Sequence, residues 1–196
     1  ITLESGKLAP TTAETIKLAA VPLYKASPSN GAELTLPLGP RLPQTTFVVP
    51  ITAYTSGQPL ESFDYSLKYD SKLLEVTAVK TSSDYDAQQN VKTSEVLLVG
   101  VRKSGVAGSK VTGKVHIANV TMRVRKGTAA AAKGLVSGVI KGMFNVQNVP
   151  LVPTGTLIAV RGPNGTDETG EVSAAATRFA GSMRGPRSLK PSTRRR

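Results

Sequence analysis

The sequence contains no cysteine, no tryptophan and a single histidine, His116. Without cysteine the chain has no disulfide, no thiolate metal ligand and no cysteine nucleophile. One histidine excludes metal sites built from two or three histidines. No phosphate-binding motif is present, because the glycines of residues 105–113 are not followed by a helix pattern or by Gly-Lys-Ser/Thr. We therefore expect a non-catalytic protein without a cofactor, in which His116 is a core or rim side chain held by a hydrogen bond.

Long apolar runs are absent as well. No run reaches the roughly 18 apolar residues of a membrane-spanning helix, and no signal-peptide pattern is present, so we expect no membrane span in this segment. The chain begins with Ile1 rather than Met, which indicates a processed or excised segment. A secretion signal or a membrane anchor would then lie outside it.

Acidic side chains are missing from the C-terminal end. The net charge is +12, and residues 178–196 hold seven of the 25 basic side chains and none of the 13 acidic ones, which leaves +5 for residues 1–177. Residues 166–196 are rich in Gly, Ala, Ser, Pro and Arg, and this composition predicts disorder or order imposed by a partner. The tail offers contacts to an anionic partner through Arg184, Arg187, Lys190, Arg194, Arg195 and Arg196.

Residues 60–79 carry the clearest structural pattern. Phe63, Tyr65, Leu67 and Tyr69 alternate with polar residues, as in a strand with one solvated face. A polar turn at residues 70–72 follows, and residues 73–79 alternate again. Three of the five tyrosines lie between residues 60 and 86, so we expect the aromatic part of the core here.

The same alternation of apolar and polar residues recurs along the chain and predicts about nine strands and no long helix. The expected strands are 15–24, 34–38, 44–55, 63–69, 73–79, 95–102, 114–125, 135–147 and 154–161. Residues 80–94 are predicted to be a long loop, and residues 126–133 a turn or a single helical turn. Residues 95–102 (EVLLVGVR) are apolar on both sides and are predicted to be covered on both faces. The expected inward side chains of the later strands are His116, Ala118, Val120, Met122, Val124, Val136, Ile140, Phe144 and Val146.

These strands predict an all-β protein, a two-sheet antiparallel jelly-roll-like sandwich. The expected domain limits are a lead-in at 1–13, the sandwich at 14–162 and a basic flexible tail at 163–196. We expect that deletion of residues 163–196 leaves the fold intact.

Acidic pairs are the remaining candidates for chemistry. Asp84 and Asp86 would supply oxygen ligands to calcium, although two carboxylates in a polar segment are more often solvated charge. Asp64 and Asp70 flank Lys68, which favours a surface ion pair over a catalytic carboxylate pair. We interpret the acids at the start of the tail, Asp167, Glu168 and Glu171, as solvated charge.

Two Asn-x-Ser/Thr sequons are candidate glycosylation sites, at Asn119 and at Asn164. Asn119 is predicted on the outer face of a strand, which permits modification in a secreted chain. Asn164 is predicted in a turn, which favours it. Triplets of this kind also arise by chance in a chain of this size.

Three segments together resemble a cohesin-type module: FVVPI, FDYSLKYD with its following leucine and valine, and GKVHIANVTMRV, at residues 47–51, 63–76 and 113–124. Ser71 stands where that family usually has a proline. The resemblance implies a nine-strand jelly-roll sandwich, no catalysis, and recognition of another protein through one sheet face and adjoining loops. Cohesin-like modules occur in cellulosomes and also in eukaryotic surface proteins, so it does not imply a dockerin-type partner. The contact residues of the family vary, and none is transferred.

The sequence thus favours a non-catalytic protein–protein interaction or assembly module of a larger extracellular or cell-surface structure. It would bind other protein chains, self-assembly included, through a sheet face or an edge strand, and the exposed faces of residues 60–70 and 114–125 are candidates. The alternative is a coat-type structural subunit whose Arg-rich tail binds nucleic acid; an acidic glycan is a further possible ligand of the tail. A sugar-binding module ranks lower, because there is no tryptophan and most other aromatic side chains are predicted inward.

Overall fold

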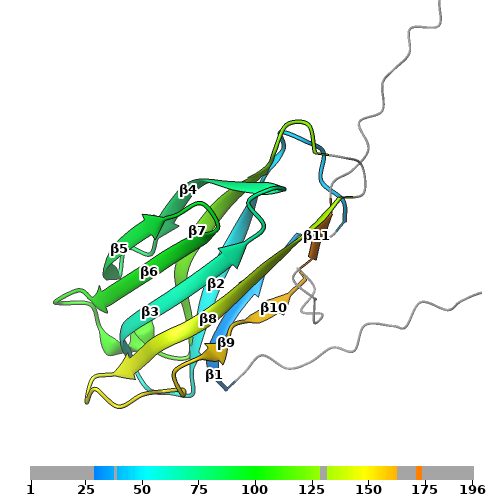
Figure 1. Ribbon diagram of the computed structural model, residues 1–196. Coiled ribbons are helices and arrows are strands. Elements are labelled where there is room, and N and C mark those ends of the chain that lie inside the picture. The colour runs from blue at the N-terminus through cyan, green and yellow to red at the C-terminus, as the bar shows by residue number, and fades with distance from the viewer. Residues whose placement is uncertain (1–28, 38, 129–131, 163–170, 174–196) are drawn as a thin grey trace, which may run out of the picture.

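Two β-sheets pack face to face as a sandwich (Figure 1). The computed structural model describes residues 29–37, 39–128, 132–162 and 171–173. The strands are β1 (Asn30–Thr35), β2 (Thr46–Thr55), β3 (Leu60–Tyr69), β4 (Leu74–Thr81), β5 (Tyr85–Val91), β6 (Glu95–Arg102), β7 (Lys114–Val124), β8 (Lys133–Asn145), β9 (Thr156–Leu157), β10 (Ala159–Arg161) and β11 (Glu171–Ser173). One 3₁₀ turn, Gly108–Val111, precedes β7. No helix in the described ranges is long and apolar enough to cross a membrane.

The first sheet, called here the β2 sheet, has the strand order β10-β1-β2-β7-β4. The second, the β3 sheet, has the order β11-β8-β3-β6-β5, and β9 also pairs with β8. Neighbouring strands are antiparallel except β1 and β10, which run parallel. The predicted all-β two-sheet sandwich is therefore confirmed, with more strands than the nine expected.

The core fills the space between the sheets and is richest around β3. Tyr65 is fully buried and stacks on Phe63 with ring centroids 5.2 Å apart, and Tyr85 meets Phe63 edge-on at 5.1 Å. Alternation along β3 turns the rings of Phe63 and Tyr65 inward, as the sequence predicted. The aromatic core is thus built from β3 and β5.

The predicted long loop at 80–94 is wrong, because residues 85–91 form β5 at an edge of the β3 sheet. Only Tyr85 of this strand is buried, and residues 88–91 are exposed on both sides. An edge strand that is largely solvated has no need of apolar alternation, so residues 86–90 of β5 are polar apart from Ala87.

Two β-bulges change which side chains face the core. On β7, Ala118 pairs with Ile51 and His116 pairs with Thr52, so Ile117 is an extra residue and the inner face shifts by one position. His116, predicted to be inward, is therefore exposed, whereas Ile117 is fully buried. The predicted inward residues from Ala118 to Val124 are confirmed.

The second bulge lies on β8. Gly142 pairs with Asp64 and Ile140 pairs with Tyr65, so Lys141 is the extra residue. Met143 is consequently buried, Phe144 is only half-buried, and Val146, which follows the strand, is 52% exposed. The inward prediction thus holds for Val136 and Ile140, whereas it is wrong for Phe144 and Val146.

The ends of the chain also differ from the prediction. The expected last strand, 154–161, divides into β9 on the β3 sheet and β10 on the β2 sheet. The expected strand at 34–38 begins earlier, at Asn30. The segment expected to follow the fold as a flexible tail contains β11, which pairs with β8 and buries Val172 to 4% exposure. The expected strand at 15–24 lies outside the described residues.

Candidate functional site

The outer face of the β3 sheet, called here the front face, is the strongest candidate for a functional surface. It comprises the outward side chains of four strands that are in register with one another. They are Asp86, Gln88 and Asn90 of β5; Glu95, Leu97, Val99 and Val101 of β6; Ser62, Asp64, Ser66 and Lys68 of β3; and Leu135, Ser137, Val139 and Phe144 of β8.

Apolar side chains lie across the front face in rows. In one row Leu97 of β6, Ser66 of β3 and Val139 of β8 are neighbours in register, and Leu157 of β9 extends it. Leu157 is 74% exposed and Val99, in the next row, is 47% exposed. Apolar side chains of this row therefore stand on both sides of Ser66 of β3. Large exposed apolar patches are typical of surfaces that bind another molecule.

Residues 95–102 were predicted to be covered on both faces, and that prediction is wrong for the outer face. Val99 and Val101 are 47% and 50% exposed, although their sequence pattern is that of a strand buried on both sides. In the isolated chain the outer apolar side chains of β6 therefore remain exposed to solvent.

A charged group at one end of the front face is held in its ionised form. Ser66 is 1% exposed, and its hydroxyl donates a hydrogen bond of 2.5 Å to Glu95 Oε1. This hydrogen bond lowers the pKa of Glu95, and Lys92, 3.5 Å away, acts in the same direction. Lys68 pairs with Glu95 in register and is exposed. This end of the front face is therefore polar and charged.

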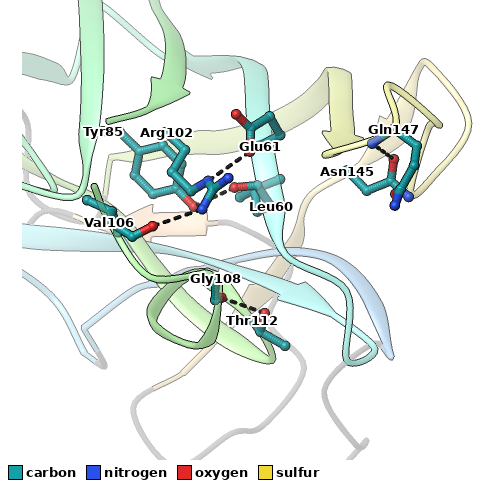
Figure 2. A network of polar contacts seen from close by, with 9 residues as sticks. All are labelled: Leu60, Glu61, Tyr85, Arg102, Val106, Gly108, Thr112, Asn145 and Gln147. Atoms are coloured by element: carbon teal, nitrogen blue, oxygen red, sulfur yellow. Dashed lines mark hydrogen bonds and ion pairs between the residues drawn. The ribbon is translucent and has the colours of Figure 1, made fainter. Parts of the chain in front are cut away.

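At the other end of the front face, Arg102 forms hydrogen bonds with β3 and with the loop after β6. Its Nε donates to Glu61 Oε2 at 2.8 Å and its Nη1 donates to the Val106 carbonyl at 2.8 Å, as Figure 2 shows. Beside it the Tyr85 hydroxyl donates to the Leu60 carbonyl at 3.3 Å. Through Arg102, these bonds connect the loop after β6 to β3 at this end of the face.

A loop beyond β8 is organised by Asn145. Its Oδ1 accepts a hydrogen bond from the backbone N–H of Gln147 at 3.0 Å (Figure 2). The same oxygen accepts from the backbone N–H of Val149 at 2.9 Å, and Nδ2 donates to Gln58 Oε1 at 2.6 Å. The loop presents Val146 and Val149, each 52% exposed. This network was not predicted from the sequence, where an asparagine ahead of a turn is its only signal.

A hollow of about 520 Å³ lies where β3, β8 and β11 meet. Lys133 and Glu171 form an ion pair of 2.9 Å at its edge. Its lining is mixed: Lys68, Tyr69, Asp70, Lys133, Gly134, Leu135, Ser137 and Glu171. Glu171, expected to be solvated charge, thus forms an ion pair.

The outer face of the β2 sheet is of a different character. Glu75 of β4 binds Arg123 of β7 at 2.6 Å and lies 3.9 Å from Arg125. Val48 of β2 is 47% exposed, but its register neighbour on β7 is Thr121. Charged and hydroxyl side chains therefore dominate this face.

Two residues singled out from the sequence lie on this second face. Asn119 of the first sequon is half-buried on β7, in register with Pro50 and Lys80. His116 lies near it, beside a hollow that both residues line. Partial desolvation lowers the pKa of His116. Nothing in the described part of the chain joins this histidine to an acidic or metal-binding cluster.

The acidic candidates are not brought together. Asp86 lies 3.9 Å from Lys103, and the Asp84 backbone N–H bonds to the Ser82 hydroxyl at 3.3 Å. No group of three His, Cys, Asp or Glu side chains able to hold a metal occurs in the described ranges.

The predicted ion pair of Asp64 and Asp70 with Lys68 is not formed among the described residues. Asp70 instead caps its turn, where Oδ1 accepts from the Lys72 N–H at 2.9 Å. Several candidates from the C-terminal segment lie outside the described residues. They are the second sequon residue, the first two acids of the tail and the cations of the tail: Asn164, Asp167, Glu168, Arg184, Arg187, Lys190, Arg194, Arg195 and Arg196.

Comparison with known proteins gives one family match. The family model described as "Cohesin domain" matches residues 41–155. A search of curated proteins found no match.

Solved structures similar to this chain are cohesins. A cohesin from Clostridium thermocellum, solved in a type I cohesin–dockerin complex, has a TM-score of 0.54 at 16% identity, covering 77% of this chain and 98% of that one. The sixth cohesin of scaffoldin B from Acetivibrio cellulolyticus, in complex with a dockerin mutant, has 0.53 at 17%, covering 68% and 98%. A non-cellulosomal cohesin from Archaeoglobus fulgidus has 0.53 at 13%, covering 76% and 93%.

Proposed function

The chain belongs to the cohesin domain family, and from this premise we propose that it is a non-catalytic module that binds another protein chain through the front face. Two of the similar cohesins were solved in complexes with dockerins. The proposal takes from them only the mode of action, a sandwich that holds a second chain. The chemistry of the partner is argued from the residues of this chain.

The exposed apolar rows of the front face carry the proposal. Val99 and Val101 on β6 and Leu135 on β8 are 47%, 50% and 60% exposed. The two valines lie in register with Asp64 and Ser62 of β3, and Leu135 lies in register with Glu171 of β11. Covering such side chains contributes about 25 cal/mol for each Å² of apolar surface removed from water, from which the entropy cost of association is subtracted. A partner with apolar side chains at its centre and polar ones at its rim fits this surface.

The polar end of the face supplies specificity. Glu95 is held ionised by Ser66, and Lys68 is exposed beside it. A partner that places a cation near Glu95 and an anion near Lys68 would be favoured over one with the reverse arrangement.

We further propose that the chain acts outside the cell or at its surface, as part of a larger assembly. Asn119 lies on the β2 sheet and the apolar rows on the β3 sheet, so a glycan at this sequon would leave the front face free. The basic C-terminal residues would add attraction to an acidic partner chain. The mass of the chain from its natural source, before and after removal of N-glycans, tests the location, and loss of partner affinity on removal of residues 174–196 tests the arm.

Two valines of equal exposure give a matched test of the front face. Val99 and Val48 are each 47% exposed, but they lie on opposite outer faces of the sandwich. Immobilised wild type, Val99→Lys and Val48→Lys would be exposed to extract from the natural source, with thermal unfolding of each variant as the folding control. We expect one set of proteins to be retained by wild type and Val48→Lys and lost from Val99→Lys. Equal retention by the two variants would contradict the proposal.

A further inference from the structure

Strand β5 is an unusually open edge. The other strands that end the two sheets are short or distorted: β10 and β11 have three residues each, and β4 has a bulge at Thr77 and the charged residues Glu75 and Lys80. In contrast, β5 has seven residues in unbroken register with β6. It contains no proline, and residues 87–91 carry no charge. Natural sheets usually protect their edges by the devices seen on β4, β10 and β11, and β5 has none of them between residues 87 and 91.

The backbone groups on this edge can be assigned from two hydrogen bonds. Lys103 N–H donates to the Asp84 carbonyl at 3.0 Å, and Lys92 N–H donates to the Glu95 carbonyl at 2.8 Å. Hydrogen-bonded pairs recur at every second residue of an antiparallel ladder, so the even-numbered residues from 84 to 92 bond to β6. The N–H and C=O groups of Ala87, Gln89 and Val91 therefore point away from β6 along the open edge.

We propose that β5 pairs antiparallel with β5 of a second copy of this chain, about a two-fold axis at Gln89. In this register Gln89 lies opposite itself, Ala87 lies opposite Val91, and residue 88 lies opposite residue 90. Asp86 of each copy then lies opposite Lys92 of the other, twice in the dimer. The edge is thus complementary to itself in backbone hydrogen bonds, in apolar contact and in charge.

Asp86 and Lys92, the charged residues that face each other in this register, form only long ion pairs within one copy. The Asp86 carboxylate is 79% exposed and lies 3.9 Å from Lys103. The Lys92 side chain is 53% exposed and lies 3.5 Å from Glu95. Exposed pairs of this length contribute little to stability, so both groups are available to a partner. Both positions are even-numbered and lie on the same side of the strand, as a cross-chain pair requires.

The pairing joins two β3 sheets into one, because the axis is perpendicular to the strands and to the sheet. Both front faces then point to the same side. One consequence rests on the proposed function: a partner with two binding segments would engage both copies with increased avidity.

Charge reversal tests the register. Sedimentation velocity of the full chain would be followed over a concentration series into the high micromolar range. Asp86→Lys and Lys92→Glu each place like charges opposite one another twice, so each variant alone is expected to dimerise about tenfold more weakly. In an equal mixture, the introduced lysine at position 86 faces the introduced glutamate at position 92, and the unchanged Lys92 and Asp86 face each other. The mixture is therefore expected to regain wild-type dimerisation.

A second pair of variants tests the backbone. Gln89→Pro removes an outward N–H without removing a bond to β6 and is expected to abolish the dimer, whereas Gln89→Ala retains it. Thermal unfolding of each variant checks that the monomer is folded. A wild type that stays monomeric throughout the series would overturn the proposal, and so would a dimer that none of these substitutions weakens. Failure of the Val99→Lys test leaves this proposal standing, because Val99 lies on β6.

Discussion

For three buried tyrosines, the loss of the hydroxyl group is predicted to change the free energy of unfolding in opposite directions. The Tyr65 side chain is fully buried, and its hydroxyl has no hydrogen-bond partner in the described part of the chain. The Tyr69 hydroxyl donates to the Lys92 carbonyl at 2.8 Å, and the Tyr85 hydroxyl donates to the Leu60 carbonyl at 3.3 Å. Substitution of each by phenylalanine removes one oxygen and keeps the ring.

The expected magnitudes follow from these partners. A buried polar group without a partner costs about 1–3 kcal/mol, whereas an intact hydrogen bond contributes about 1 kcal/mol. Tyr65→Phe is therefore expected to raise the free energy of unfolding by about 1 kcal/mol, at the lower end of that range because the missing oxygen leaves a small void. Tyr69→Phe is expected to lower it by about 1 kcal/mol, and Tyr85→Phe by less, since its bond is longer.

Guanidinium unfolding of the four proteins measures these differences. The dependence of the free energy on denaturant should be the same in all four, so that the midpoints report stability alone. The reasoning would be refuted by a Tyr65→Phe protein that loses as much stability as Tyr69→Phe, because the Tyr65 hydroxyl would then be bonded.

Further predictions concern pH, packing and the C-terminal segment. Burial raises the pKa of all three tyrosines above the value of about 10 that they have in the unfolded chain. Their neutral forms stabilise the fold below pH ~10, and the free energy of unfolding should fall as the pH rises further. In a pH titration, tyrosine absorbance at about 295 nm should change together with circular dichroism. Gly100→Ala should cost about 1–3 kcal/mol, measured by the same unfolding assay, because its new methyl group would overlap the Phe63 ring. Deletion of residues 163–196 should lower the thermal midpoint, because it removes Val172 from the core and so about 1.5–3 kcal/mol of burial, whereas deletion of residues 174–196 should not; equal midpoints would show that β11 contributes nothing.

Strands with one wet face were predictable from the sequence. In β3 the alternation of residues 63–69 fixed both the strand and its inner face, because every second side chain is buried. The order of such strands, together with the motifs at 47–51, 63–76 and 113–124, was enough to indicate the cohesin family. The alternation of the sequence predicted the structure correctly in strands where the apolar side chains of the pattern are the ones that pack in the core.

Bulges and edges were not predictable in the same way. A single extra residue, Ile117 on β7 or Lys141 on β8, reverses the inward face. Gly142 follows Lys141 and is a sequence signal for a bulge, whereas no glycine or proline adjoins Ile117. The edge strand β5 has a loop-like composition because it is solvated on both sides. These features depend on the pairing of strands far apart in the chain.

The front face itself was only partly visible in the sequence. Residues 60–70 were named as a candidate face, but the apolar side chains come mainly from β6 and β8. A sequence such as EVLLVGVR does not distinguish burial inside the fold from burial under a partner. The register of β6 with β3 and the exposure of Val99 and Val101 show that both face outward.

The most direct test of the central claim is a footprint of the bound partner. A protein retained by wild type and Val48→Lys but not by Val99→Lys would be purified, and the complex and the free chain would be oxidised by hydroxyl radicals and compared by mass spectrometry. We predict that Val99, Val101 and Leu135 lose reactivity in the complex, while Val48 keeps the reactivity it has in the free chain. Protection of Val48 with the three front-face residues unchanged would place the binding surface on the β2 sheet and contradict the account.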